Sequence, residues 1–265
     1  MCLERLRDSV QQFSLTNYEV IVSDDGPVNN AKELIEKSFA WVKWVEGPKK
    51  GPAANRNNGA KNAKGNWLIF FDDDCLPDNN ILKEYKLAID KNEQIRVFEG
   101  KIISSLPFTT PLHYSPINLT GGYLWACNFA IEKLVFKDLR GFDENFKFPH
   151  FEDIDLLDRI KIKGYTPLFL PDAFVDHPPR DLSSGKKLGL HHESDYYYYQ
   201  EKRNIKVSMT GLVKKILYAR APHFFKYKIS KHSLLFIQLI ISEIAVVILN
   251  HRKWKKAHPQ SRIKR

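Results

Sequence analysis

Three consecutive aspartates, Asp72, Asp73 and Asp74, end an apolar run in this sequence of 265 residues. Adjacent carboxylates repel one another, so a folded protein keeps such a cluster only where positive charge compensates it. A divalent cation supplies that charge, and Mg²⁺ and Mn²⁺ prefer carboxylate oxygens as ligands. Because Asp72 and Asp74 are two residues apart, the pattern predicts a cation site with open positions for a diphosphate. A solvated acidic turn is the alternative.

A second acidic pair, Asp24 and Asp25, precedes Gly26 at the end of another expected strand. Asp-Gly is also a common turn pair, so the pair alone leaves a plain turn open. A carboxylate at this position could accept a hydrogen bond from a nucleobase imide or a ribose hydroxyl, as acidic residues do in dinucleotide-binding folds.

A third acidic group begins with Glu152 and Asp153, after a run of phenylalanines. These acids open an expected helix, where the helix dipole favours ionised carboxylates, so capping is one interpretation. A carboxylate rimmed by apolar rings is also a reasonable general base. His177 follows a later strand and could complete a metal site, or be structural.

Alternating helix and strand patterns surround these acids. The expected helices are Leu3–Phe13, Ala31–Phe39, Asn55–Ala63 and Phe151–Lys163, and the expected strands are Tyr18–Ser23, Trp41–Val45, Trp67–Phe71, Asn128–Ile131 and Thr166–Leu170. Such alternation predicts an α/β protein with a mostly parallel sheet, whose ligand site lies at the carboxyl ends of its strands. Both aspartate clusters fall at strand ends of this kind.

The order of these acidic groups, with Arg56-Asn57 and Gly121-Gly122, resembles that of the family-two glycosyltransferases, which are inverting, nucleotide-sugar-dependent enzymes. The matching segments are YEVIVSDDG, GPAANRNNGAKNAKGNWLIFFDDDCLP, GGYLWACNFAIEK, RGFDENF and FEDIDLLDRIKIKGY. The resemblance implies a Rossmann-like sheet of the A-type glycosyltransferase fold. It also implies a central first strand, which we expect to be missing because the first helix begins at Met1.

The resemblance further implies residues that bind the donor, a nucleotide sugar that is usually a UDP-sugar. Asp25, with Asp24 beside it, matches the acid that recognises the base of the nucleotide, and Arg56 matches a basic residue near the donor diphosphate. The residues expected to contact the donor are Asp24, Asp25, Arg56, Asp72, Asp73 and Gly122.

The metal and the catalytic base also follow from the resemblance. The expected ligands of Mn²⁺ or Mg²⁺ are Asp72, Asp74 and His177. Asp153 matches the catalytic base and Glu152 supports it. The cation would stabilise the departing nucleoside diphosphate, while Asp153 takes a proton from the acceptor hydroxyl, giving inversion in a single displacement.

Positive charge is concentrated in the C-terminal quarter of the chain. The formal net charge is +10, and residues 200–265 contain 16 Lys and Arg but 2 acidic residues. We therefore expect a glycosyltransferase domain over residues 1–200 and a basic helical segment over 201–265. The apolar run Leu234–Leu249 would form a helix of roughly 24 Å, shorter than a hydrocarbon core of about 30 Å. We expect it to lie on an anionic membrane surface, with a buried docking helix as the alternative.

The remaining composition narrows the class of protein. A hydrophobic content of 43% excludes wholesale disorder. Three widely spaced cysteines, without a Cys/His ligand spacing, indicate neither a disulfide framework nor a zinc site. A charged N-terminus is unlike a signal peptide. These features predict a cytoplasmic protein on the cytoplasmic face of the cell membrane, acting on a saccharide or lipid-linked acceptor in polysaccharide or glycolipid synthesis.

Three other functions remain open at this point. A nucleotidyltransferase would share the metal-bound aspartates, but no Gly-rich phosphate loop is visible. A nucleic-acid-binding protein would use the basic segment with Tyr196–Tyr199 as a stacking platform. A catalytically silent membrane adaptor would retain the fold. We expect no nucleic-acid partner.

Overall fold

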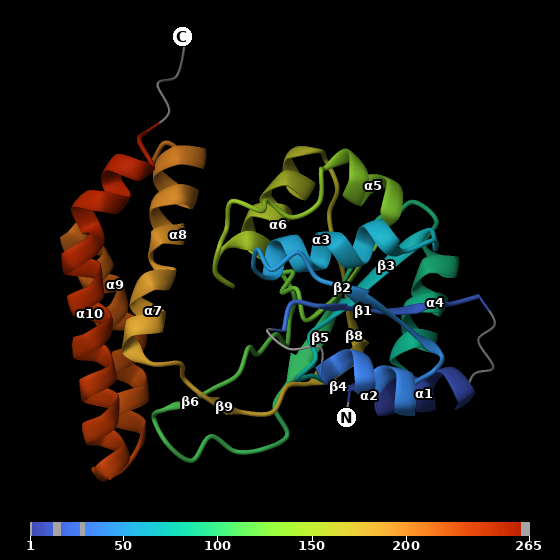
Figure 1. The fold of residues 1–265 in the computed structure, drawn as a ribbon, viewed down its shortest axis with the longest axis horizontal. Helices are drawn as coiled ribbons and strands as arrows, with labels where there is room; N and C mark the ends of the chain where they lie inside the picture. Colours follow the sequence, from blue (N-terminus) through green and yellow to red (C-terminus); the bar gives the residue numbers. More distant parts are fainter. Residues whose placement is uncertain (1, 13–16, 27–29, 261–265) are drawn as a thin grey trace. The chain divides into compact units, whose positions relative to one another are not determined.

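The computed structural model describes residues 2–12, 17–26 and 30–260 (Figure 1). The chain divides into two compact units, the first formed by Met1–Ser105 with Pro116–Pro178 and the second by Leu106–Ser115 with Pro179–Arg265. The expected boundary at residue 200 lies inside the second unit. Each unit buries an apolar core of its own.

The first unit contains a two-stranded and a five-stranded sheet. In the first sheet, β1 (Val20–Asp24) and β2 (Val42–Glu46) pair in parallel. The second has the order β3-β7-β5-β8-β4. Its strands are β3 (Trp67–Phe71), β4 (Leu76–Pro77), β5 (Val97–Ile103), β7 (Asn128–Glu132) and β8 (Leu168–Asp176). The ends of β1, β3 and β8 carry the predicted aspartates of the donor and metal sites and His177.

The α/β class expected from the sequence is confirmed, but the sheet is mixed rather than mostly parallel. Among the strands that the structure describes in this unit, only β1–β2 and β5–β8 pair in parallel, whereas β3–β7, β5–β7 and β4–β8 are antiparallel. Parallel neighbours need a long crossover, usually a helix, while antiparallel neighbours do not. No helix lies in the described chain between β5 and β7, so β7 returns antiparallel. In the described residues, β1 and β3 also belong to separate sheets.

Six helices of the first unit surround these strands in the described residues. They are α1 (Cys2–Gln12), α2 (Asn30–Ser38), α3 (Pro52–Asn62), α4 (Ile81–Lys91), α5 (Lys133–Asp138) and α6 (Glu152–Ile162). Of these elements, α4 and α5 were not predicted from the sequence, nor was strand β5. The expected end of the first helix, Phe13, lies outside the described residues. Leu156 and Ile160 of α6 are fully buried, and the burial of each side chain stabilises the fold by about 1.5–3 kcal/mol.

The second unit is mainly helical. It contains α7 (Gly185–His191), α8 (Glu193–Asp195), a π-helix (Tyr196–Lys202), α9 (Met209–Lys226) and α10 (Lys231–Ala257), with the short pair β6 (His113–Tyr114) and β9 (Arg180–Asp181). Figure 1 shows α7, α9 and α10 together. Gly189 of α7 allows close packing, because an added Cβ would lie 2.6 Å from Val246 Cβ of α10.

Helix α10 is longer than the apolar run alone predicts. Its 27 residues correspond to about 40 Å. The length of the helix therefore does not exclude that it spans a hydrocarbon core. By length and composition α10 could cross a membrane, although the core helix of a soluble protein can pass the same test. Glu243 lies inside this helix, where it is buried and paired with Arg220 of α9 at 3.2 Å.

Candidate active site

Arg56 of α3 joins two of the predicted acidic groups. Its Nη2 donates to Asp72 Oδ1 at 2.8 Å, and its Nη1 donates to Glu152 Oε1 at 3.0 Å. Burial opposes the charge on Arg56, but the Asp72 and Glu152 carboxylates outweigh it and raise the pKa of the guanidinium. The structure thus brings the end of β3 and the start of α6 to one basic side chain.

Asparagines beside Arg56 hold α3 in place. Asn55 Nδ2 donates to Ser23 O at 2.8 Å and Asn58 Nδ2 to Glu46 O at 2.9 Å, so α3 contacts the ends of β1 and β2. The Asn57 side chain exchanges two hydrogen bonds with the backbone of Phe142. This role of the asparagines was not predicted from the sequence. The polar run NRNN inside an expected helix was the available signal.

Asp24 and Asp25 lie where β1 meets the loop after β2. Asp24 accepts hydrogen bonds from the Gly26 amide at 2.9 Å and from Trp44 Nε1 at 3.2 Å. Asp25 Oδ1 accepts from the Lys49 amide at 2.6 Å. Both carboxylates therefore also support the local loops, as the turn interpretation expected.

Glu152 and Asp153 are the most perturbed acids of the site. Burial raises the pKa of Glu152 to about 7, with the Asp153 charge adding to the effect and Arg56 opposing it. Burial also raises the pKa of Asp153, against the hydrogen bond from the Ile154 amide and the charge of Arg56. A carboxylate whose pKa approaches neutral pH is suited to accept a proton.

This burial gives a pH-dependent stability. The pKa of Glu152 is about 7 in the fold against 4.5 ordinarily, so the folded protein holds a proton that the unfolded chain has released. The stabilisation is complete below pH 4.5 and is lost as the pH rises to 7, by about 3 kcal/mol. We expect Glu152→Gln to remove this decline, measured by urea unfolding across that range. Glu36→Gln, at an exposed position, should keep it; an unchanged decline in Glu152→Gln would contradict the assignment.

Asp74 and His177 come together from distant parts of the sequence. His177 Nε2 lies 3.3 Å from Asp74 Oδ1, and the imidazole is 1% exposed. His177 Nδ1 lies 3.2 Å from Pro178 O, and because a carbonyl only accepts, Nδ1 carries the proton in this hydrogen bond. In the neutral imidazole with this tautomer, Nε2 carries the lone pair that binds a metal, whereas a protonated imidazole would form an ion pair with Asp74.

Gly122 and Asp73 are placed differently. The Gly122 amide donates to Glu99 Oε2 at 2.7 Å, and Glu99 Oε1 also accepts from the amides of Tyr123 and Leu124. Asp73 is exposed at the end of β3. Sequence reasoning missed Glu99, whose buried carboxylate anchors this loop; a lone acid inside the apolar run of β5 was its signal.

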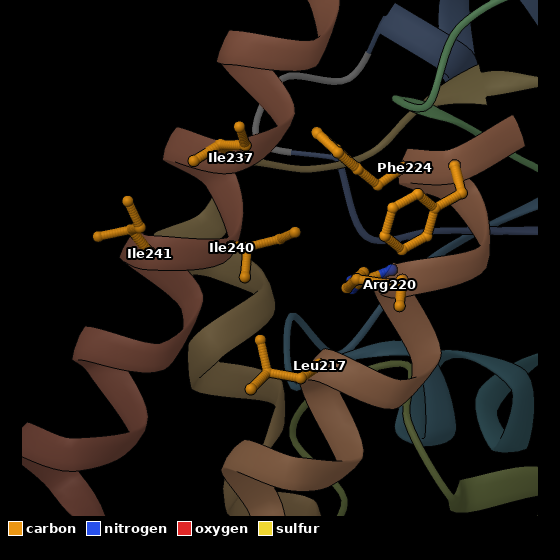
Figure 2. A pocket seen from close by; sticks show the side chains of 8 residues that line it. Leu217, Arg220, Phe224, Ile237, Ile240 and Ile241 are labelled. Carbon is orange, nitrogen blue, oxygen red and sulfur yellow. The ribbon is translucent and has the colours of Figure 1, made fainter. Parts of the chain in front are cut away.

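The second unit contains an apolar groove of about 320 Å³ between α9 and α10. Figure 2 shows its labelled lining residues: Leu217, Arg220, Phe224, Ile237, Ile240 and Ile241. Arg220 is paired with Glu243, so the groove presents little net charge. The acids predicted to act in catalysis, Glu152 and Asp153, belong to the first unit.

Residues 2–143 match the family model described as glycosyl transferase family 2, and the chain belongs to this family. The family expected from the resemblance is therefore confirmed.

Curated proteins that are similar in sequence are also named as glycosyltransferases. The chain is 37% identical over 71 residues to an uncharacterized glycosyltransferase of Haemophilus influenzae, covering 26% of this chain and 24% of the relative. It is 24% identical over 218 residues to a cholesterol galactosyltransferase of Borreliella burgdorferi, covering 71% and 59%. The matches thus span 24% and 59% of the length of these two relatives.

Solved structures confirm the fold. A structure of S. aureus TarS 1-349 in complex with UDP-GlcNAc has a TM-score of 0.54 at 17% identity, covering 95% of this chain and 88% of that one. GalNAc-T7 with UDP, GalNAc and Mn²⁺ has a TM-score of 0.51 at 19% identity, covering 77% and 48%. The A-type glycosyltransferase fold expected from the sequence is therefore present.

Proposed function

We propose that this protein transfers a sugar, with inversion, from a UDP-sugar to an acceptor hydroxyl at the site around Arg56. One observation carries the proposal: Arg56 is hydrogen-bonded to both Asp72 and Glu152, so the predicted cation site adjoins the predicted base. UDP-GlcNAc in one structural neighbour and UDP with Mn²⁺ in another support the donor and the ion.

The residues present fit a divalent cation. Asp74 Oδ1 and His177 Nε2 lie 3.3 Å apart, a separation that two ligands of one ion can have, and Asp72 lies at the end of the same strand as Asp74. When bound, Mn²⁺ or Mg²⁺ would offset the charge of the diphosphate leaving group. Asp25 and Asp24 would bind the nucleobase of the donor, and Arg56 would remain near its phosphates.

Asp153 is the proposed catalytic base. Its raised pKa suits proton transfer from the acceptor hydroxyl as that oxygen attacks the anomeric carbon. Glu152 and Arg56 position the start of α6 beside the donor site. No covalent intermediate with a side chain is needed.

The first test is metal-dependent UDP binding. UDP at about 100 times its Kd should stabilise the wild type by about 2.7 kcal/mol, and only with Mn²⁺ present. Asp74→Asn should weaken this binding at least about 10- to 100-fold, because it removes a ligand. Thermal unfolding with UDP, with and without Mn²⁺, measures both effects.

Asp90→Asn is the matched control, since this exposed acid of α4 lies outside the site and should keep the full shift. Stabilisation by UDP that is independent of Mn²⁺ would contradict the proposed roles of Asp72 and Asp74. Hydrolysis of UDP-Glc, UDP-Gal and UDP-GlcNAc, assayed in parallel, identifies the donor.

We infer further that the second unit holds the enzyme on the cytoplasmic face of a membrane, beside a lipid or lipid-linked acceptor. Phe225, Ile229 and Leu234 are 82%, 87% and 63% exposed around the turn between α9 and α10. Lys226, Lys228 and Lys231 surround the same turn. A surface that combines exposed apolar side chains with lysines favours anionic lipid. The relative named as a cholesterol galactosyltransferase supports a lipid acceptor.

This membrane contact depends on the three lysines around the turn. Each lysine near an anionic surface contributes about 1 kcal/mol, so replacing Lys226, Lys228 and Lys231 with Gln should weaken binding about 100-fold. Sedimentation with vesicles of phosphatidylserine and phosphatidylcholine measures the loss. Replacing the exposed Lys37, Lys61 and Lys91 with Gln removes the same charge from the first unit and should change binding little. Equal losses in the two variants would refute the assigned surface.

A further inference from the structure

We propose that Cys75 joins Asp74 and His177 in a preformed site for a thiophilic divalent cation such as Zn²⁺. The inference rests on the proposed function in placing a cation at Asp74 and His177, and it adds a sulfur donor that neither the sequence pattern nor the family resemblance assigned. A carboxylate oxygen of Asp74, the Cys75 sulfur and a ring nitrogen of His177 all lie within 4.8 Å of one another.

Strand register brings these residues together. β4 pairs antiparallel with β8, with Leu76 opposite Asp176. Continuing this register by one residue places Cys75 opposite His177, and directly opposed side chains have Cβ atoms about 4.5–5.5 Å apart. No short zinc-ligand spacing is visible in the sequence, because β5, β7 and β8 lie between Cys75 and His177 along the chain.

The distance between the nitrogen and oxygen donors suits tetrahedral coordination. Zn–N bonds of about 2.0–2.1 Å and Zn–O bonds of about 2.0–2.2 Å, at a tetrahedral angle, separate the two ligand atoms by about 3.4 Å. His177 Nε2 and Asp74 Oδ1 are 3.3 Å apart. With a neutral imidazole that carries its proton on Nδ1, both atoms can offer an electron pair to one cation.

The combination of sulfur, nitrogen and oxygen donors favours a sulfur-binding ion such as Zn²⁺ over Mg²⁺. Cys75 and His177 are 0% and 1% exposed, while the Asp74 side chain is 37% exposed and gives the ion a route from solvent. Cys75 is a free cysteine, so sulfur enters the site as a thiol. On binding, the S–H proton leaves for solvent and a sulfur lone pair forms the bond to the ion.

The test is titration of the nucleotide-free protein with Co²⁺, a spectroscopic substitute for Zn²⁺. The wild type should show a thiolate-to-cobalt charge-transfer band that saturates at one ion per chain and disappears when Zn²⁺ is added. Cys75→Ser should lose the band and bind Co²⁺ at least about 10-fold more weakly. The double variant Cys2→Ser/Cys127→Ser leaves Cys75 as the sole thiol and should keep the band.

Absence of the band in the folded wild type, or its survival in Cys75→Ser, would overturn the proposal. If Cys75→Ser fails to fold by circular dichroism, the double variant decides: a retained band supports the site and a lost band refutes it. The proposed function is tested separately, because Mn²⁺-dependent UDP binding should persist in a folded Cys75→Ser protein. A cobalt band without any UDP binding would defeat the donor site and leave the zinc site standing.

Discussion

Asp153→Asn should retain donor binding and lose about 100- to 10,000-fold in transfer rate, the usual contribution of a general base. The substitution keeps the size of the side chain and removes its ability to take the acceptor proton. Donor binding should persist because the residues proposed to hold UDP and the cation lie on α3 and at the ends of β1, β3 and β8. The thermal shift by UDP with Mn²⁺ measures binding, and UDP release from the donor sugar measures turnover.

Two further variants of α6 are compared with Asp153→Asn: Asp158→Asn, which is the control, and Glu152→Gln, which tests the alternative base. Asp158→Asn changes a carboxylate of α6 outside the proposed machinery and should leave turnover unchanged. Full turnover in Asp153→Asn would refute its role as base. If Glu152→Gln then lost turnover, the base would be Glu152, whose pKa of about 7 also suits proton transfer.

Arg56→Met should lower the free energy of unfolding by about 3–5 kcal/mol, the cost typical of breaking a buried ion pair from one side. Methionine keeps much of the apolar stem but leaves Asp72 and Glu152 without their shared cation. The loss should shrink in the double variant Arg56→Met/Glu152→Gln, because the buried carboxylate is then neutral. Urea unfolding of the two single variants and the double variant gives the coupling energy.

Arg96 provides a matched ion pair at the surface. It lies 3.2 Å from Glu132, but its side chain is 40% exposed, against 16% for Arg56. Arg96→Met should therefore cost at most about 1 kcal/mol. Equal costs at the two positions would show that Arg56 does not bridge a buried pair.

Local patterns predicted much of the fold. The apolar run Trp67–Phe71 is β3 with the same ends, because a strand buried among other elements reads as a continuous apolar stretch. The acids at its end indicated that this edge carries chemistry. The helix beginning at Glu152 was equally visible, since its apolar residues recur with helical spacing.

Features that depend on long-range pairing were not predictable in the same way. The mixed sheet follows from how the chain returns between β5 and β7, which no local periodicity records. Glu99 became identifiable as a loop anchor only once Gly122 and its neighbours were placed around it. The proximity of Cys75 to His177 likewise depends on the register of β4 with β8. The order of the motifs supplied the family, which the local patterns alone did not.

The separation of β1 and β3 into different sheets has a consequence for substrate selection. Within the described chain, the acids proposed to bind the nucleobase follow β1, and those proposed to hold the cation and the diphosphate follow β3. The two strands belong to sheets that share no strand pairing. Helix α3 connects them, because Asn55 holds the end of β1 while Arg56 reaches Asp72 at the end of β3. We therefore expect this turn of α3 to set the distance between the proposed nucleoside and pyrophosphate subsites. Changes in this turn would alter which donors fit, even where every acidic group is preserved.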